Sequence, residues 1–166
     1  SFTGSRDVGE HICQTAGLKK VTMELGSNAP LIVMADADLE KVAAATATTG
    51  FANAGQVCIS TQRVFASSEI YSDFIDALKP AVEALTTGNP LDENVSMGPM
   101  IRTQDAERVE AWVQEAVSTG ASIVTGGTRE GTMHAPTILA DVAPEMKVSC
   151  DEIFGPALGI SPIDDI

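Results

Sequence analysis

Pro30-Leu-Ile-Val-Met34 is an uninterrupted apolar run, and Asp36-Ala-Asp38 follows it almost directly. Such a run indicates a strand of a parallel sheet, because those strands are covered on both faces. The aspartates can cap a helix, which we expect over the alanine-rich residues 39–49. A buried strand that leads into a helix is the repeating unit of layered α/β domains.

The same alternation continues on both sides of this stretch. We expect further strands at residues 20–25, 62–66, 122–125, 137–139 and 157–161, and further helices at 6–16, 72–85 and 103–119. Ser72 is the expected cap of the helix 72–85, and Pro80 inside it predicts a kink or a lost hydrogen bond. This order predicts an α/β fold, a layered α/β/α arrangement around a largely parallel sheet.

Composition narrows the class of protein. The 166 residues, 44% hydrophobic and 20% charged, are typical of one globular domain with a sizeable core. We find no apolar run as long as a membrane span and no signal-peptide pattern at the start. The net charge of −13 disfavours nucleic acid and anionic membranes as partners.

The cysteines and histidines form no disulfide or metal pattern. Three widely spaced cysteines, Cys13, Cys58 and Cys150, contain no CxxC pair. Because only two histidines accompany them, we expect no structural metal site. Free thiols fit a reducing compartment, and we therefore expect a cytoplasmic location.

Three features could carry chemistry. Cys58 follows Gly55 closely, so its thiol could project from a loop as a nucleophile, although most cysteines are small buried hydrophobes. Glu24 ends an expected strand, where α/β folds form ligand clefts, although it could equally face solvent. Gly4-Ser5 precedes a helix whose N–H groups could meet a phosphate, or it could be a plain loop with a serine cap.

A cysteine–histidine hydrolase is a rival interpretation of Cys58. It needs a histidine that the fold brings to the thiol. His11 and His134 are the only candidates, and neither lies in a recognisable signature.

Four ordered phrases point to a known family: Phe2-Thr-Gly-Ser5, Met23-Glu-Leu-Gly26, Gly55-Gln-Val-Cys58 and Glu152-Ile-Phe-Gly-Pro156. Together they resemble the aldehyde dehydrogenase superfamily, and the resemblance extends over essentially all 166 residues. It implies the catalytic-domain type of that fold and oxidation of an aldehyde to a carboxylic acid with NAD or NADP.

The resemblance also implies roles for the two reactive candidates. Cys58 matches the family's nucleophile, which forms a thiohemiacetal and then a thioester with the aldehyde. Glu24 matches the general base that activates water to hydrolyse the thioester. A glutamate at this position favours hydrolysis over transfer of the acyl group to coenzyme A.

Further residues match the family's cofactor site. Gly4 and Ser5 correspond to the turn at the cofactor phosphates, and Val8 corresponds to the helix position that flanks adenine. Four others match residues around the nicotinamide and its ribose: Leu25, Gly26, Glu152 and Phe154. Glu152 is the one expected to hold the ribose hydroxyls.

The 166 residues match only part of the family pattern, and two positions differ from it. Residues 1–25 resemble the C-terminal remnant of an NAD(P)-binding domain, and residues 26–166 resemble a catalytic domain truncated at its C-terminal end. We therefore expect the 166 residues alone to be inactive. Ser27 stands where many members have a second glycine, and His134 stands where an aromatic residue is common.

Two other functions stay open at this point. A truncated domain could serve in association without catalysis, and exposed apolar sheet edges would favour a homo-oligomer. Alternatively, Cys58 could support a thiol esterase that needs no cofactor.

Overall fold

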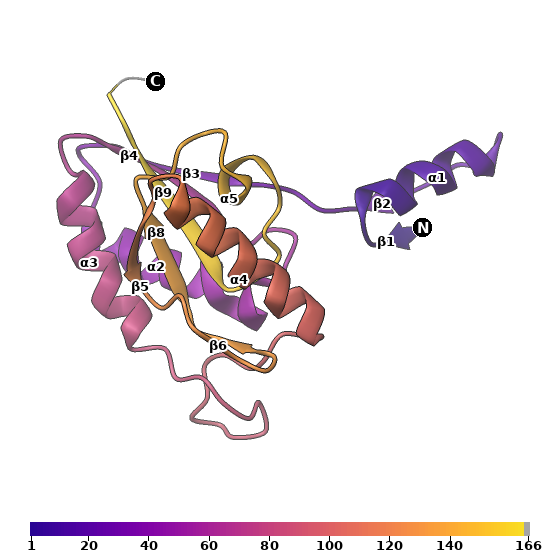
Figure 1. Cartoon of the computed structure of the whole chain (residues 1–166). Helices are drawn as coiled ribbons and strands as arrows, with labels where there is room; N and C mark the ends of the chain where they lie inside the picture. Colours follow the sequence, from indigo (N-terminus) through magenta and orange to yellow (C-terminus); the bar gives the residue numbers. More distant parts are fainter. Residues whose placement is uncertain (165–166) are drawn as a thin grey trace.

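The structure is a computed structural model that describes residues 1–164, and its centre is a five-stranded sheet (Figure 1). The first four strands in spatial order run parallel, and the last runs antiparallel to its neighbour. In that order the strands are β3 Pro30–Val33, β4 Arg63–Ser67, β9 Ala157–Ile163, β8 Thr137–Ala140 and β5 Ser122–Thr125. The expected largely parallel sheet is confirmed.

Helices cover both faces of this sheet. Figure 1 shows α2 (Leu39–Phe51) and α3 (Tyr71–Glu83) on one face, and α4 (Thr103–Ser118) on the other. The short α5 (Lys147–Cys150) packs against α4 and β9. The layered α/β/α arrangement is therefore confirmed as well.

The core follows the periodicity of the helices and strands. Along α3 the buried side chains recur at helical spacing, at Phe74, Leu78 and Val82. They meet buried strand residues such as Ile138 and Leu158 within one hydrophobic cluster. Each such side chain stabilises the fold by about 1.5–3 kcal/mol through loss of apolar surface to water.

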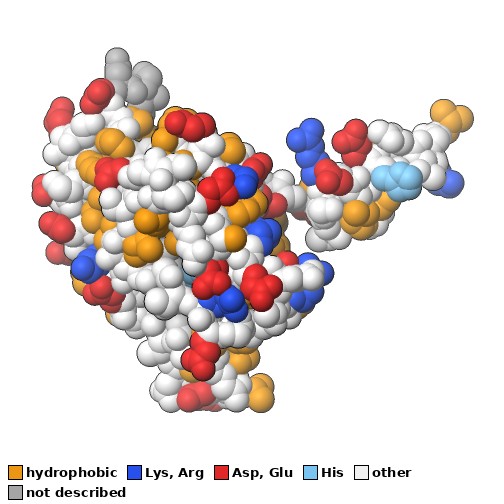
Figure 2. All heavy atoms as spheres, viewed as in Figure 1, with side chains coloured by type: hydrophobic (Ala, Val, Ile, Leu, Met, Phe, Trp, Pro, Cys, Tyr) orange, Lys and Arg blue, Asp and Glu red, His pale blue; other side chains and the backbone are white. Residues whose placement is uncertain are grey.

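A small N-terminal unit stands apart from the main body (Figures 1 and 2). It contains β1 (Phe2–Thr3), α1 (Arg6–Ala16) and β2 (Met23–Glu24), and the two strands pair in parallel. Helix α1 lies close to the end of β2, because a Cβ atom on Gly9 would come within 2.6 Å of the Leu25 side chain. Acidic side chains are spread over the visible face of the main body (Figure 2).

The expectations for the third helix need two corrections. Helix α3 begins at Tyr71 with Ile70 at the cap position, so Ser72 lies within the helix and does not cap it. The Phe74 N–H already bonds the Ile70 carbonyl at 2.8 Å, which starts the helix earlier than the serine suggested. Pro80 lies inside α3, and the helix continues past it as far as Glu83, short of the expected end at residue 85.

The remaining elements are short. The expected strand 20–25 is reduced to β2, because only two of its residues pair with β1. The hairpin of β6 (Arg129–Glu130) and β7 (Met133–His134) was not expected from the sequence, and neither was α5. Elements of two to four residues are too short to show a periodicity.

Candidate active site

A cleft of about 680 Å³ lies where the N-terminal unit meets the main body. It is lined from the N-terminal side by Thr3, Gly4, Ser5, Glu24, Leu25 and Gly26, and from the main body by Gln56, Val57, Cys58, Glu152 and Phe154. These residues come from four separate stretches of sequence. Eight of the nine predicted site residues therefore line one cleft.

The ninth predicted residue, Val8, lies elsewhere. It is exposed on α1 and is not among the residues that line the cleft. Gly4 and Ser5, in contrast, reach the cleft at the point where α1 begins. Ser5 occupies the cap position of α1 without a side-chain hydrogen bond to the helix, so the helix N-terminus opens toward the cleft.

Cys58 lies on a tight loop between α2 and β4. The loop starts with a 3₁₀ turn, Ala52–Gly55, in which Asn53 and Ala54 have φ values of 50° and 55°. Gly55 follows with a φ of 67°, a conformation that glycine adopts without strain. These left-handed residues reverse the chain, and Cys58 is consequently exposed at the cleft.

Gln56, a member of the motif Gly55-Gln-Val-Cys58, stabilises this loop through contacts that the motif does not predict. Its amide nitrogen donates to the Asn53 carbonyl at 3.0 Å, and its side-chain oxygen accepts from the Ile101 N–H at 3.0 Å. The second bond joins segments 45 residues apart. No local pattern predicts such a contact, so only the fold reveals how Gln56 connects the loop to residue 101.

Glu152 enters the cleft beside Gly26. The Ser27 N–H donates to Glu152 Oε1 at 3.0 Å, and a Cβ atom on Gly26 would overlap Glu152 Oε2. The carboxylate thus lies directly over a residue that has no side chain. Glycine is required here for a close approach and not for an unusual backbone angle.

An arginine lies near Glu152. Burial lowers the pKa of the Arg108 guanidinium, while the charges of Asp105 and Glu152 act in the opposite direction. Arg108 also stacks over the Trp112 ring, 4.9 Å from its centroid. The aromatic contact holds the guanidinium in place, close enough for its charge to interact with that of Glu152.

The two histidines are not among the residues that line the cleft with Cys58. His11 is on α1, and His134 is buried in the β6–β7 hairpin, where its Nδ1 lies 2.9 Å from the Ala135 carbonyl oxygen. Neither residue lines the cleft in the described part of the chain. This arrangement does not support a cysteine–histidine hydrolase.

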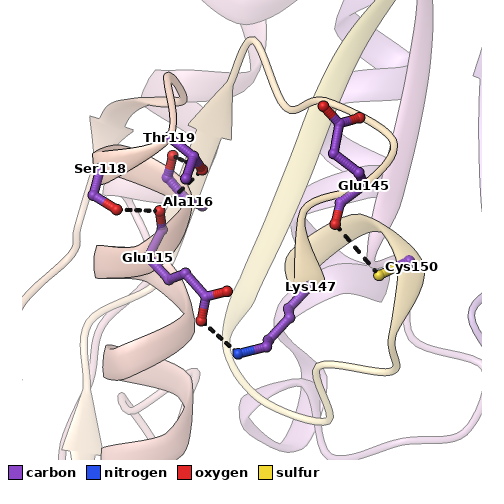
Figure 3. A network of polar contacts seen from close by, with 7 residues as sticks. All are labelled: Glu115, Ala116, Ser118, Thr119, Glu145, Lys147 and Cys150. Atoms are coloured by element: carbon purple, nitrogen blue, oxygen red, sulfur yellow. Dashed lines mark hydrogen bonds and ion pairs between the residues drawn. The ribbon is translucent and has the colours of Figure 1, made fainter.

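The other two cysteines are not among the residues that line the cleft. Cys13 is exposed on α1, and Cys150 is exposed at the end of α5. Figure 3 shows the Cys150 Sγ directed at the Glu145 carbonyl, 3.8 Å away, near the ion pair of Lys147 with Glu115 at 2.6 Å. Of the three thiols, only that of Cys58 lines the cleft.

Metal sites and membrane spans are both missing from residues 1–164. In this part of the protein, no group of three or more His, Cys, Asp or Glu side chains could hold a metal ion. Within the same residues, every helix falls short of the length and apolar character that crossing a bilayer demands.

Comparisons with known proteins find aldehyde dehydrogenases. A 3-sulfolactaldehyde dehydrogenase of Priestia aryabhattai is 52% identical over 166 residues, which are 100% of this chain and 35% of that protein. A lactaldehyde dehydrogenase of Methanococcus aeolicus is 40% identical over 100% of this chain and 36% of its own length. The chain thus spans about a third of the length of these relatives.

Solved structures of aldehyde dehydrogenases also match this chain. The glyceraldehyde-3-phosphate dehydrogenase GapN of Methanocaldococcus jannaschii, complexed with NADP, matches with a TM-score of 0.96 and 39% identity, over 99% of this chain and 36% of that chain. Lactaldehyde dehydrogenase from Escherichia coli matches with a TM-score of 0.92 and 41% identity, over 98% of this chain and 35% of that chain. The profile of the aldehyde dehydrogenase family matches residues 1–166. This chain belongs to the aldehyde dehydrogenase family.

Proposed function

We propose that the protein containing these residues oxidises an aldehyde to a carboxylic acid with NAD or NADP. The observation that carries the proposal is the single cleft that Cys58 and Glu24 share with Gly4, Ser5 and Glu152. A nucleophile, a carboxylate base and the residues expected to hold a dinucleotide come together there. The names of the relatives, for lactaldehyde and 3-sulfolactaldehyde, favour a short aldehyde as substrate.

Cys58 is the proposed nucleophile. Its thiolate attacks the aldehyde carbon and forms a thiohemiacetal, and loss of hydride from that carbon leaves a thioester on Sγ. The backbone N–H of Cys58 would donate to the developing oxyanion. The exposed position of the thiol on a tight loop, supported by the left-handed residues before it, suits this role.

Glu24 is the proposed base for the second step. Its carboxylate removes a proton from water, which attacks the thioester carbon and releases the acid while Sγ leaves as the thiolate. Glu24 ends β2 and is exposed at the cleft that Cys58 also lines. Water can therefore reach both residues.

The cleft suits the phosphates and the nicotinamide–ribose part of a dinucleotide. The open N-terminus of α1 at Gly4 and Ser5 suits a phosphate, because its N–H groups and the helix dipole favour an anion. Glu152, held through Oε1 by the Ser27 N–H, is placed to accept from ribose hydroxyls. The cleft volume also lies in the usual range for cofactor sites, roughly 300–1,000 Å³. When bound, the cofactor accepts the hydride that leaves the substrate carbon.

The division of the chain follows from the same proposal. We assign residues 1–25 to the cofactor-binding domain and residues 26–166 to the catalytic domain. The N-terminal unit has its own two-stranded sheet and stands apart from the five-stranded sheet, which supports this boundary (Figure 1). The cleft then lies between the two domains.

Replacement of each cysteine in the full-length protein tests the proposal. Cys58→Ala should abolish both aldehyde oxidation and ester hydrolysis, because no other thiol lines the described cleft. Cys13→Ala and Cys150→Ala are matched controls that should retain activity. Thioester formation that persists in Cys58→Ala would refute the assignment, and ester hydrolysis indifferent to added NAD or NADP, without aldehyde oxidation, would favour a thiol esterase.

A further inference from the structure

We propose that Ser27 is a positioning residue. It fixes the loop that carries Cys58 relative to the carboxylate of Glu152, which is proposed to bind the cofactor. This inference rests on the proposed function of the cleft. The Ser27 hydroxyl donates to the Cys58 carbonyl, and the Ser27 N–H donates to Glu152 Oε1 at 3.0 Å. One residue thus bonds both groups between which substrate and cofactor would meet.

Ser27 can serve in this way because the residue after it is anchored. The Asn28 side-chain nitrogen donates to the Ser149 carbonyl at 2.8 Å, and the Arg63 guanidinium donates to the Asn28 carbonyl at 2.7 Å. These bonds tie the segment between β2 and β3 to β4 and to the segment just before Glu152. The position of Ser27 is therefore set by the main body.

The two bonds act on different groups. The hydroxyl bond fixes the peptide on the carboxyl side of Cys58, and with it the direction in which Sγ projects. The N–H bond fixes one oxygen of Glu152, while the other oxygen lies over Gly26. Only the first bond depends on the side chain, so a substitution can separate the two effects.

The Ser27→Ala variant removes the hydroxyl and keeps the backbone N–H. We expect kcat for aldehyde oxidation to fall about five-fold, the effect of one ordinary hydrogen bond. The cofactor Kd, measured by fluorescence quenching, should stay unchanged because Glu152 keeps its partner. Ser27→Thr restores a hydroxyl at an exposed position and should restore kcat.

A thiol probe separates positioning from a change in thiol chemistry. Iodoacetamide reacts with a thiolate in any accessible orientation, so its rate and pH profile at Cys58 should be the same in Ser27→Ala and in the parent protein. Ser118→Ala is the matched control, because the Ser118 hydroxyl also donates to a carbonyl, that of Glu115 at 2.7 Å, on the far end of α4 (Figure 3). It should change none of these quantities.

The results distinguish this inference from the proposed function. An unchanged kcat in Ser27→Ala, no rescue by Ser27→Thr, or a loss of cofactor affinity as large as the loss of kcat would overturn the role of Ser27 alone. A parent protein that oxidises no aldehyde, or a Cys58→Ala variant that does, would overturn the proposed function itself. A lower kcat with unchanged cofactor affinity, rescued by threonine, supports both.

Discussion

The loop that carries Cys58 contacts the loop after Glu152 backbone to backbone: a Cβ atom on Gly55 would overlap the Gly155 carbonyl oxygen. Gly155 is itself packed closely, because a Cβ atom there would overlap the Val109 side chain on α4. The two glycines bring the proposed nucleophile and the proposed ribose-binding carboxylate onto neighbouring segments. The geometry of the cleft therefore depends on the absence of two side chains.

Gly55→Ala should displace the cysteine loop. Backbone cannot move aside as a flexible side chain can, and the left-handed φ adds strain of about 1–3 kcal/mol in an alanine. We expect a lower unfolding midpoint in urea together with a large loss of aldehyde oxidation. Gly17→Ala is the matched control, since Gly17 has a φ of 62° and a Cβ atom added there would meet nothing within 4 Å. It should lose stability without the loss of activity, and full activity in Gly55→Ala would contradict the close contact.

Gly26→Ala should weaken cofactor binding and leave the fold intact. The added methyl group would meet the far end of the Glu152 side chain, which can rotate away, so stability changes little. A displaced carboxylate loses charge-assisted bonds to ribose hydroxyls, and the cofactor Kd should rise about ten-fold or more. In a Glu152→Ala background the same change should have no further effect on Kd. Equal effects in both backgrounds would argue that Gly26 acts independently of Glu152.

Gln62→Leu should destabilise the segment that positions Glu152. Gln62 is fully buried, and its side-chain oxygen accepts from the Ile153 N–H at 2.5 Å. Leucine would leave that buried N–H without an acceptor, at a cost of about 1–3 kcal/mol in the free energy of unfolding, offset in part because it also removes the buried Gln62 Nε2, which has no hydrogen-bond partner. Urea titration measures the loss, and Gln114→Leu, on the exposed side of α4, is the control that should change stability little. A stability equal to that of the parent protein would contradict the role of the bond.

His134 should make the protein less stable in mild acid. Burial lowers the pKa of His134, although the Ala135 carbonyl and the charge of Glu110 act in the opposite direction. The unfolded chain therefore binds a proton below the ordinary pKa of 6.5 that the folded protein does not. The stability that this group contributes is complete above pH 6.5 and decreases as the pH falls below it. His134→Phe should flatten this part of the stability–pH curve. The control His11→Gln changes an exposed residue on α1 and should leave the curve as it is. An unchanged slope in His134→Phe would rule out this role for His134.

The sequence predicted helices and strands well where apolar runs and capping residues were clear. The apolar run 30–34 and the capping aspartate of α2 led to β3 and to the start of α2, and the Asp38 side chain accepts from the Lys41 N–H as a cap should. The expectation that this strand is buried was wrong, because β3 is the edge strand of the sheet and Ile32 and Met34 are about half exposed. The prediction that Ser72 caps α3 was wrong, because a serine near the start of a helix need not occupy the N-cap position. The reactive pair Cys58 and Glu24 was identified through the ordered motifs, since each residue alone had an ordinary structural explanation.

The contacts that hold the cleft together could not be read from the sequence. Gln56 bonds a partner 45 residues away, and Ser27 bonds partners 31 and 125 residues away. Such pairings depend on the sheet order, in which β9 lies between β4 and β8. Periodicity and capping describe neighbours along the chain and carry no information about this order.

In the proposed mechanism Cys58 forms the covalent intermediate and Glu24 releases it. Mass spectrometry of the full-length Glu24→Gln variant, mixed with aldehyde and cofactor, tests this most directly, because glutamine cannot take the proton from water. We predict that an acyl group accumulates on the peptide that contains Cys58, with a burst of reduced cofactor stoichiometric with the active sites. Steady turnover without a trapped acyl group, or an acyl group on Cys13 or Cys150, would contradict the mechanism.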